Sequence, residues 1–154
     1  MKTITLYIIC SMLILISNCG VSQNNTYEKQ ADYMLLEFYA KHFQVWEIPS
    51  LPSDVRYEKL DSLMEKYCTS KLRNKAREVF KNVGADFLTN DLIGNLNENL
   101  KVERDTANEN GYFVSFVSDI DKYTDAPGEA IKKQVVLHVT VIKEKDGYKI
   151  DYVK

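Results

Sequence analysis

The sequence predicts an α+β domain in which helices pack on an antiparallel sheet. First, apolar residues recur at the spacing of an α-helix in three segments up to Gly84. Second, the apolar period changes to two from Leu100 onward, which indicates β-strands. Third, Asp146-Gly147 lies near the end of the chain and is typical of a tight hairpin turn between two strands.

The first helix is expected from Thr26 to about Phe43, where Tyr33 and Tyr39 widen its apolar side. Segment 44–54 contains two prolines and is expected to form a loop. Trp46 is therefore expected on that loop. An aromatic side chain there can anchor a partner or close the end of the core, and the sequence leaves both interpretations open.

Two further helices follow. We expect the second helix to begin at a cap on Ser53 or Asp54, and the third to begin at Thr69. Gly84 is expected to end the third helix in the left-handed conformation. After a mixed, asparagine-rich stretch, four strands are expected. They cover residues 100–105, 112–118, 134–142 and 147–153, with a long polar connection between the second and the third.

The N-terminus has the layout of a bacterial export signal. Lys2 gives a positive start, and an apolar run of about thirteen residues extends from Ile4 to Ile16. That run is too short to cross a hydrocarbon core of about 30 Å as a helix. The segment Ile16-Ser17-Asn18-Cys19 resembles the bacterial lipobox, which implies that Cys19 carries a membrane-anchoring lipid.

These features predict a lipoprotein signal peptide over 1–18, a short polar tether over 19–25 and a single α+β domain over 26–154. The expected location is the cell envelope, with the lipid on Cys19 in the outer membrane or another periplasmic membrane face. Asn18 stands where the lipobox usually has Gly or Ala. The alternative is therefore a soluble periplasmic or secreted protein, cleaved near Asn18 or Val21.

Composition excludes some classes of protein. The formal net charge is −2, and basic and acidic residues are interspersed. No basic patch forms, so we expect no nucleic-acid binding. Of the three cysteines, Cys10 lies in the signal and Cys19 is the expected lipid site. Only Cys68 remains for the domain, which predicts a core without an intramolecular disulfide.

The sequence carries no strong catalytic motif, and we expect neither a cofactor nor a metal ion. It has no glycine-rich phosphate loop, Cys-x-x-Cys pair or Gly-x-Ser-x-Gly segment. Its two histidines, His42 and His138, fall on different elements and do not form a local metal-ligand pair. Enzymatic activity is therefore uncertain, and the balance favours a protein that is not an enzyme.

Three polar residues are candidates for a site. Asp86 and Asp91 bracket the junction between helices and sheet. Each can act as a general base in an apolar pocket, but capping of turns through backbone N–H groups is the favoured interpretation. His138 lies mid-strand on the same face as Val136, and both faces of that strand are apolar enough for us to expect them to be partly buried. It can line a pocket and transfer protons, or it can be a hydrogen-bonded residue of the sheet.

The stretch Tyr67-Cys68-Thr69-Ser70-Lys71-Leu72 and the segment from Asp86 to Asp91 resemble parts of a family of uncharacterised bacterial envelope proteins, the DUF3828 family. The order of elements also resembles the nuclear-transport-factor-2-like (NTF2-like), or cystatin-like, roll. This resemblance implies three N-terminal helices packed on a curled antiparallel sheet of about four strands. It implies an envelope location and no agreed reaction, and it adds Tyr67 to the candidate binding residues.

Two functions follow as hypotheses. The first is a non-enzymatic, lipid-anchored module that binds a protein or another envelope component. The second is a small-molecule site in the cone of the sheet, with Asp86, Asp91 or His138 supplying acid/base chemistry. A purely structural lipoprotein is a third interpretation. A homodimer through the open face of the sheet is also expected to be feasible, because apolar residues lie on both faces.

Overall fold

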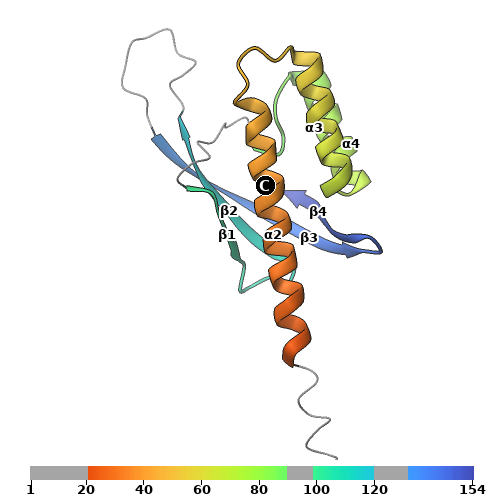
Figure 1. Ribbon diagram of the computed structural model, residues 1–154, viewed down its shortest axis with the longest axis vertical. Helices are drawn as coiled ribbons and strands as arrows, with labels where there is room; N and C mark the ends of the chain where they lie inside the picture. Colours follow the sequence, from red (N-terminus) through yellow and green to blue (C-terminus); the bar gives the residue numbers. More distant parts are fainter. Residues whose placement is uncertain (1–20, 90–98, 120–131) are drawn as a thin grey trace, which may run out of the picture. The chain divides into compact units, whose positions relative to one another are not determined.

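The computed structural model describes residues 21–89, 99–119 and 132–154. The chain divides into two compact units, residues 1–31 and 32–154. In the first unit, the described residues form the beginning of helix α2. The second unit contains the rest of α2, two further helices and a four-stranded sheet. The predicted fold class, α+β with three helices packed on an antiparallel sheet of four strands, is confirmed (Figure 1).

Helix α2 is longer than the sequence predicts and spans Val21–Trp46. The expected tether over 19–25 is therefore helical from Val21 onward, and Trp46 is the last residue of a helix, so its assignment to a loop is wrong. The first proline after the helix is Pro49, so nothing in the sequence before it blocks the last turn. The backbone N–H of Glu47 still donates to the carbonyl of Phe43 at 3.0 Å.

Helices α3 (Ser53–Tyr67) and α4 (Ser70–Val83) begin and end differently. The N-cap of α3 is Pro52, with no side-chain cap, so the expected cap on Ser53 or Asp54 is wrong. At α4 the prediction is confirmed, because the Thr69 hydroxyl accepts the N–H of Leu72 at 3.2 Å. Gly84 ends this helix with φ 74°, a left-handed conformation in which glycine is favoured.

The sheet is an antiparallel meander with strand order β1-β2-β3-β4. The strands are β1 (Lys101–Arg104), β2 (Gly111–Asp119), β3 (Lys132–Glu144) and β4 (Gly147–Val153). Thr140 pairs with Tyr152, and Val141 with Ile150, so the register shifts there by a bulge in β4. The polar connection expected between the second and third strands lies mostly outside the described residues.

The two faces of the sheet differ in burial. On β3, Val135, Leu137, Val139 and Val141 are buried, while Val136 and His138 between them are exposed. The buried face belongs to the core, where α2 lies against β2 through an edge-to-face pair of Phe43 and Phe116 with centroids 4.8 Å apart. We call the opposite face, which carries Val136 and His138, the outer face.

The break between α3 and α4 is attached to strand β4. Cys68 forms a parallel bridge with Ile150, and the Thr69 N–H donates to the Ile150 carbonyl at 2.9 Å. The Thr69 hydroxyl also donates to Oδ1 of Asp151 at 2.9 Å. This attachment covers part of the free edge of β4 and fixes the helical hairpin on the sheet.

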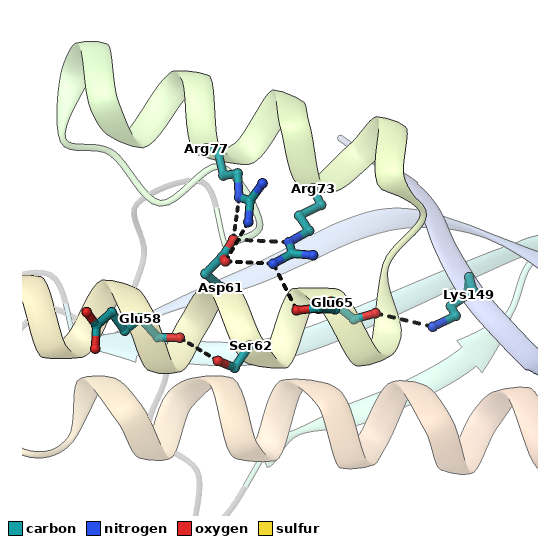
Figure 2. A network of polar contacts seen from close by, with 7 residues as sticks. All are labelled: Glu58, Asp61, Ser62, Glu65, Arg73, Arg77 and Lys149. Carbon is teal, nitrogen blue, oxygen red and sulfur yellow. Dashed lines mark hydrogen bonds and ion pairs between the residues drawn. The ribbon is translucent and has the colours of Figure 1, made fainter.

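A charged network joins α3 to α4 (Figure 2). Arg73 and Arg77 of α4 each donate two hydrogen bonds to the carboxylate of Asp61 on α3, at distances between 2.6 and 3.1 Å. These hydrogen bonds, first from Arg77 and then from Arg73, hold the pKa of Asp61 far below its ordinary value. Such bidentate pairs fix the two helices in register. None of the helices in the described ranges could span a membrane.

Candidate functional site

A buried polar pair joins the end of α2 to the loop after α4. His42 and Asp86 are 1% and 8% exposed, and Nε2 of His42 lies 2.6 Å from Oδ2 of Asp86. The indole N–H of Trp46, one helical turn after His42, donates to the same oxygen at 2.9 Å. The turn 87–89 that follows Asp86 brings this carboxylate back toward α2.

The side chain of Asp86 also stabilises the turn that follows it in the sequence. Its Oδ1 accepts the backbone N–H of Leu88 at 3.0 Å, and the side chain of Thr89 donates to it as well. Burial by itself raises the pKa of Asp86, but the neighbouring His42 and the bonds from His42, Thr89 and Leu88 outweigh it. The pKa therefore lies below its ordinary value, and the buried carboxylate stays ionised near neutral pH.

His42 has one nitrogen that the carboxylate does not use. The atom Nδ1 is buried and has no hydrogen-bond partner among the described residues. When the imidazole is neutral, Nε2 carries the proton that it donates to Asp86, and Nδ1 is then an acceptor. His42 lines a small hollow of about 20 Å³ together with Asp86.

Aromatic side chains close the interior around this group. Phe38, Tyr39, Phe43 and Phe116 are at most 1% exposed. Burial, and after it the nearby Cys68 and Asp86, raises the pKa of Tyr39 well above its ordinary value. Within the described ranges, these side chains are packed in the core. The small-molecule site expected in the cone of the sheet stays a prediction.

His138 lies apart from His42 and Asp86, on the outer face. Its ring makes an edge-to-face pair with Phe113, with centroids 4.6 Å apart. It borders an open groove of about 490 Å³, which is also lined by Thr140, Tyr152 and Lys154. Val136 on the same face is 50% exposed and Tyr152 is 43% exposed.

Tyr67 and Cys68 are packed into the core at the end of α3. Both are 4% exposed, and the Tyr67 ring lies 5.8 Å from the ring of Phe38. The Lys41 ammonium lies 3.4 Å from the Tyr67 hydroxyl. Burial raises the pKa of the Cys68 thiol to about 12, so this thiol is not an activated nucleophile.

The structure therefore brings Trp46 and Asp86 together and leaves His138 and Tyr67 elsewhere. Asp91 and Cys19 lie outside the described residues. The favoured interpretation of Asp86, a cap on a turn, is confirmed by its bond from Leu88. The partner that sequence reasoning missed is His42. Its spacing from Phe38 is that of a helix, but spacing along one helix says nothing about a residue 44 positions away.

No group of three or more metal-ligating side chains occurs in the part of the chain that the structure describes. The chemistry present in the described core is a carboxylate with several donors around it and an imidazole held in one orientation. Both are closed off from solvent.

The fold and these sites define an α+β protein with helices on one face of an antiparallel sheet. No protein-family model matches the sequence, and no curated protein matches it either. The structure is similar to the crystal structure of a protein of unknown function from Bacteroides thetaiotaomicron VPI-5482. The TM-score is 0.69 at 22% sequence identity, and the match covers 90% of this chain and 98% of the other. This similarity concerns the fold alone.

Proposed function

We propose that this chain is a lipid-anchored envelope protein whose domain binds a protein partner through the outer face of its sheet. The observation that carries the proposal is the exposure of apolar and aromatic side chains on that face. Val136 is half exposed, and Tyr152 borders the groove of about 490 Å³ beside His138. Solvent-exposed apolar side chains next to an open groove are typical of interaction surfaces.

The choice of binding over catalysis rests on the burial of the polar groups. His42 and Asp86 are the pair best suited to acid/base chemistry, and both are covered. On the outer face, the ring of His138 packs edge-to-face against Phe113. A surface of exposed aromatic rings with a few polar groups suits the binding of a polypeptide.

The anchor and the family remain part of the proposal. The sequence Ile16-Ser17-Asn18-Cys19 supports lipidation at Cys19. The resemblance to the DUF3828 family and to NTF2-like rolls stays part of the proposal, and it rests on the sequence. The stretch beginning Tyr67-Cys68-Thr69 has a defined structural role, since it joins α3 to α4 and binds the edge of β4.

The test replaces Val136 of the full chain by a photo-crosslinking amino acid, with the protein expressed in the bacterium it comes from. The matched control carries the same amino acid at Asn74. Asn74 is exposed on α4, away from the outer face. We expect an adduct from position 136 and none from position 74, and the adduct's mass separates another protein from a second copy of this chain. An anchored protein that gives no adduct from position 136 contradicts the binding surface.

Lipidation is measured separately, by native mass spectrometry of the full chain in mild detergent. A diacylglyceryl mass at Cys19 that disappears in Cys19→Ala supports the anchor. A chain that begins after Asn18 without added mass means that the protein is secreted. This result would leave the proposed binding surface unaffected.

A further inference from the structure

The small hollow between the helices combines an unsatisfied acceptor with apolar walls. His42 lines it, and Nδ1 of His42 is buried without a partner within the described part of the chain. Leu60 and Met64 of α3 and Ala76 of α4 form walls, and Tyr57 and Phe80 are stacked beside it with ring centroids 4.7 Å apart. An unpaired buried nitrogen costs free energy unless something donates a hydrogen bond to it.

The size of the hollow limits what can satisfy that nitrogen. Its volume is about 20 Å³. By the same measure, about 10–15 Å³ is enough for one water molecule, so the hollow accommodates one hydroxyl group and little more. A charged ligand is disfavoured here, because the walls are apolar and the Asp86 carboxylate is already surrounded by donors from His42, Trp46 and Leu88.

The orientation of His42 is fixed from the other side of its ring. The bond to Oδ2 of Asp86 at 2.6 Å holds Nε2, and Trp46 donates to the same oxygen. The imidazole is therefore pre-oriented, and Nδ1 can accept a hydrogen bond without loss of side-chain freedom. This arrangement, an oriented acceptor beside a small apolar hollow, is that of a site for a neutral hydrogen-bond donor.

We propose that this hollow binds a single hydroxyl group, which donates a hydrogen bond to Nδ1 of the neutral His42 imidazole. The group is either a water molecule or the terminal hydroxyl of a small alcohol. Both present the same chemistry to the imidazole, and the experiment distinguishes them. The inference is independent of the proposed binding surface on the outer face of the sheet.

The experiment uses the full chain, labelled with ¹⁵N and held in mild detergent, with methanol as the alcohol probe. Two-bond proton–nitrogen spectra report whether Nδ1 of His42 accepts a hydrogen bond. Water-to-imidazole magnetisation transfer detects an ordered water. The indole N–H of Trp46, the only tryptophan in the chain, reports methanol binding through its bond to Asp86.

His42→Gln is the matched variant, because its amide nitrogen can replace Nε2 and still donate to Asp86, while its amide oxygen does not occupy the position of Nδ1. Ala76→Leu fills the hollow from α4 and decides the question if His42→Gln fails to fold. An ordered water at Nδ1 supports the site with water as occupant. Saturable methanol binding that weakens about tenfold or more in a folded variant supports the site with an alcohol as occupant.

Two results overturn the proposal. One is a wild-type Nδ1 that shows neither an ordered water nor a saturable response to methanol. The other is methanol binding of equal affinity in wild type, His42→Gln and Ala76→Leu, because the alcohol then binds somewhere else.

Discussion

Nε2 of His42 lies 2.6 Å from Oδ2 of Asp86, although 44 positions separate the two residues in the sequence. The contact joins the last turns of α2 to the turn that follows α4. Trp46 adds a second bond to the same oxygen at 2.9 Å, so two side chains of α2 depend on one carboxylate. A buried charge with this many donors fixes the local arrangement, and the loss of one partner leaves the others unsatisfied.

Replacing the Asp86 carboxylate should therefore destabilise the whole domain. In Asp86→Asn, one oxygen becomes an amide group that cannot accept from both His42 and Trp46. We expect the free energy of unfolding to fall by about 3 kcal/mol, in the range for removing one partner of a buried, hydrogen-bonded charged group. Urea unfolding of the full chain, followed by Trp46 fluorescence, measures the change.

The control for that variant is Asp146→Asn. Asp146 is exposed in the turn before β4, where asparagine suits the turn equally well. Its unfolding free energy should stay within about 0.5 kcal/mol of wild type. Equal stability of Asp86→Asn and Asp146→Asn would mean that the buried carboxylate contributes nothing to the fold.

The sequence predicts most of the fold because period and turn signals are local. The change from helical to alternating spacing placed the three helices and four strands in the right order. Gly84 and Thr69 were assigned correctly, because a left-handed glycine and a hydroxyl cap act within one turn of a helix. Tyr33 and Tyr39 were both expected to widen the apolar side of the first helix. Tyr39 is fully buried, but Tyr33 is 70% exposed, so the expectation for Tyr33 is wrong.

Features that depend on tertiary contacts were not predictable in the same way. Trp46 was assigned to a loop because of Pro49. The helix nevertheless continues to Trp46, because its indole bonds to Asp86 and the backbone N–H of Glu47 still donates to Phe43. The pairing of His42 with Asp86 requires knowing that the loop after α4 returns to α2. His138 and Val136 were expected to be partly buried, and they are exposed because the helices of the second unit pack on the other face of the sheet.

Stability should fall in acid because of two carboxylates with lowered pKa values. Hydrogen bonds from Arg77 and Arg73 lower the pKa of Asp61. The pKa of Asp86 is also lowered: burial opposes the shift, and His42, Thr89 and Leu88 outweigh it. A depressed folded-state pKa stabilises the protein above the unfolded value of about 3.9, and this stabilisation is lost as pH falls below it. The free energy of unfolding should therefore fall as the pH drops below about 4.

Asp61→Asn tests how much of the loss of stability in acid comes from the charged network of Asp61, Arg73 and Arg77. This variant should lose less stability between pH 5 and pH 3 than wild type, because its amide cannot be protonated there. Asp146→Asn should keep the wild-type loss. If Asp61→Asn lost as much unfolding free energy in acid as wild type, Arg73 and Arg77 would not stabilise the ionised carboxylate.

Thr69 should matter through its hydroxyl, which caps α4 and binds Asp151 on β4. It accepts the Leu72 N–H at 3.2 Å and donates to Asp151 at 2.9 Å. Thr69→Val keeps the shape and removes both bonds, and we expect a loss of about 2 kcal/mol in unfolding free energy. Thr69→Ser keeps the hydroxyl and should lose less than about 1 kcal/mol, the value of one buried methyl group. Equal losses in the two variants would assign the effect to packing.

Cys68 should be unreactive in the folded protein. It is 4% exposed, and burial raises its pKa to about 12. At pH 8 its thiolate fraction is then about one in ten thousand, against about a quarter for a free cysteine. With Cys10 and Cys19 replaced by serine, Ellman's reagent should react with native Cys68 only as fast as the protein opens, and rapidly in urea.

The matched control moves the thiol to Ser70, which is exposed, in a Cys68→Ala background. That native protein should react at once, and equally fast reaction of native Cys68 would show that the attachment of the α3–α4 break to β4 opens readily.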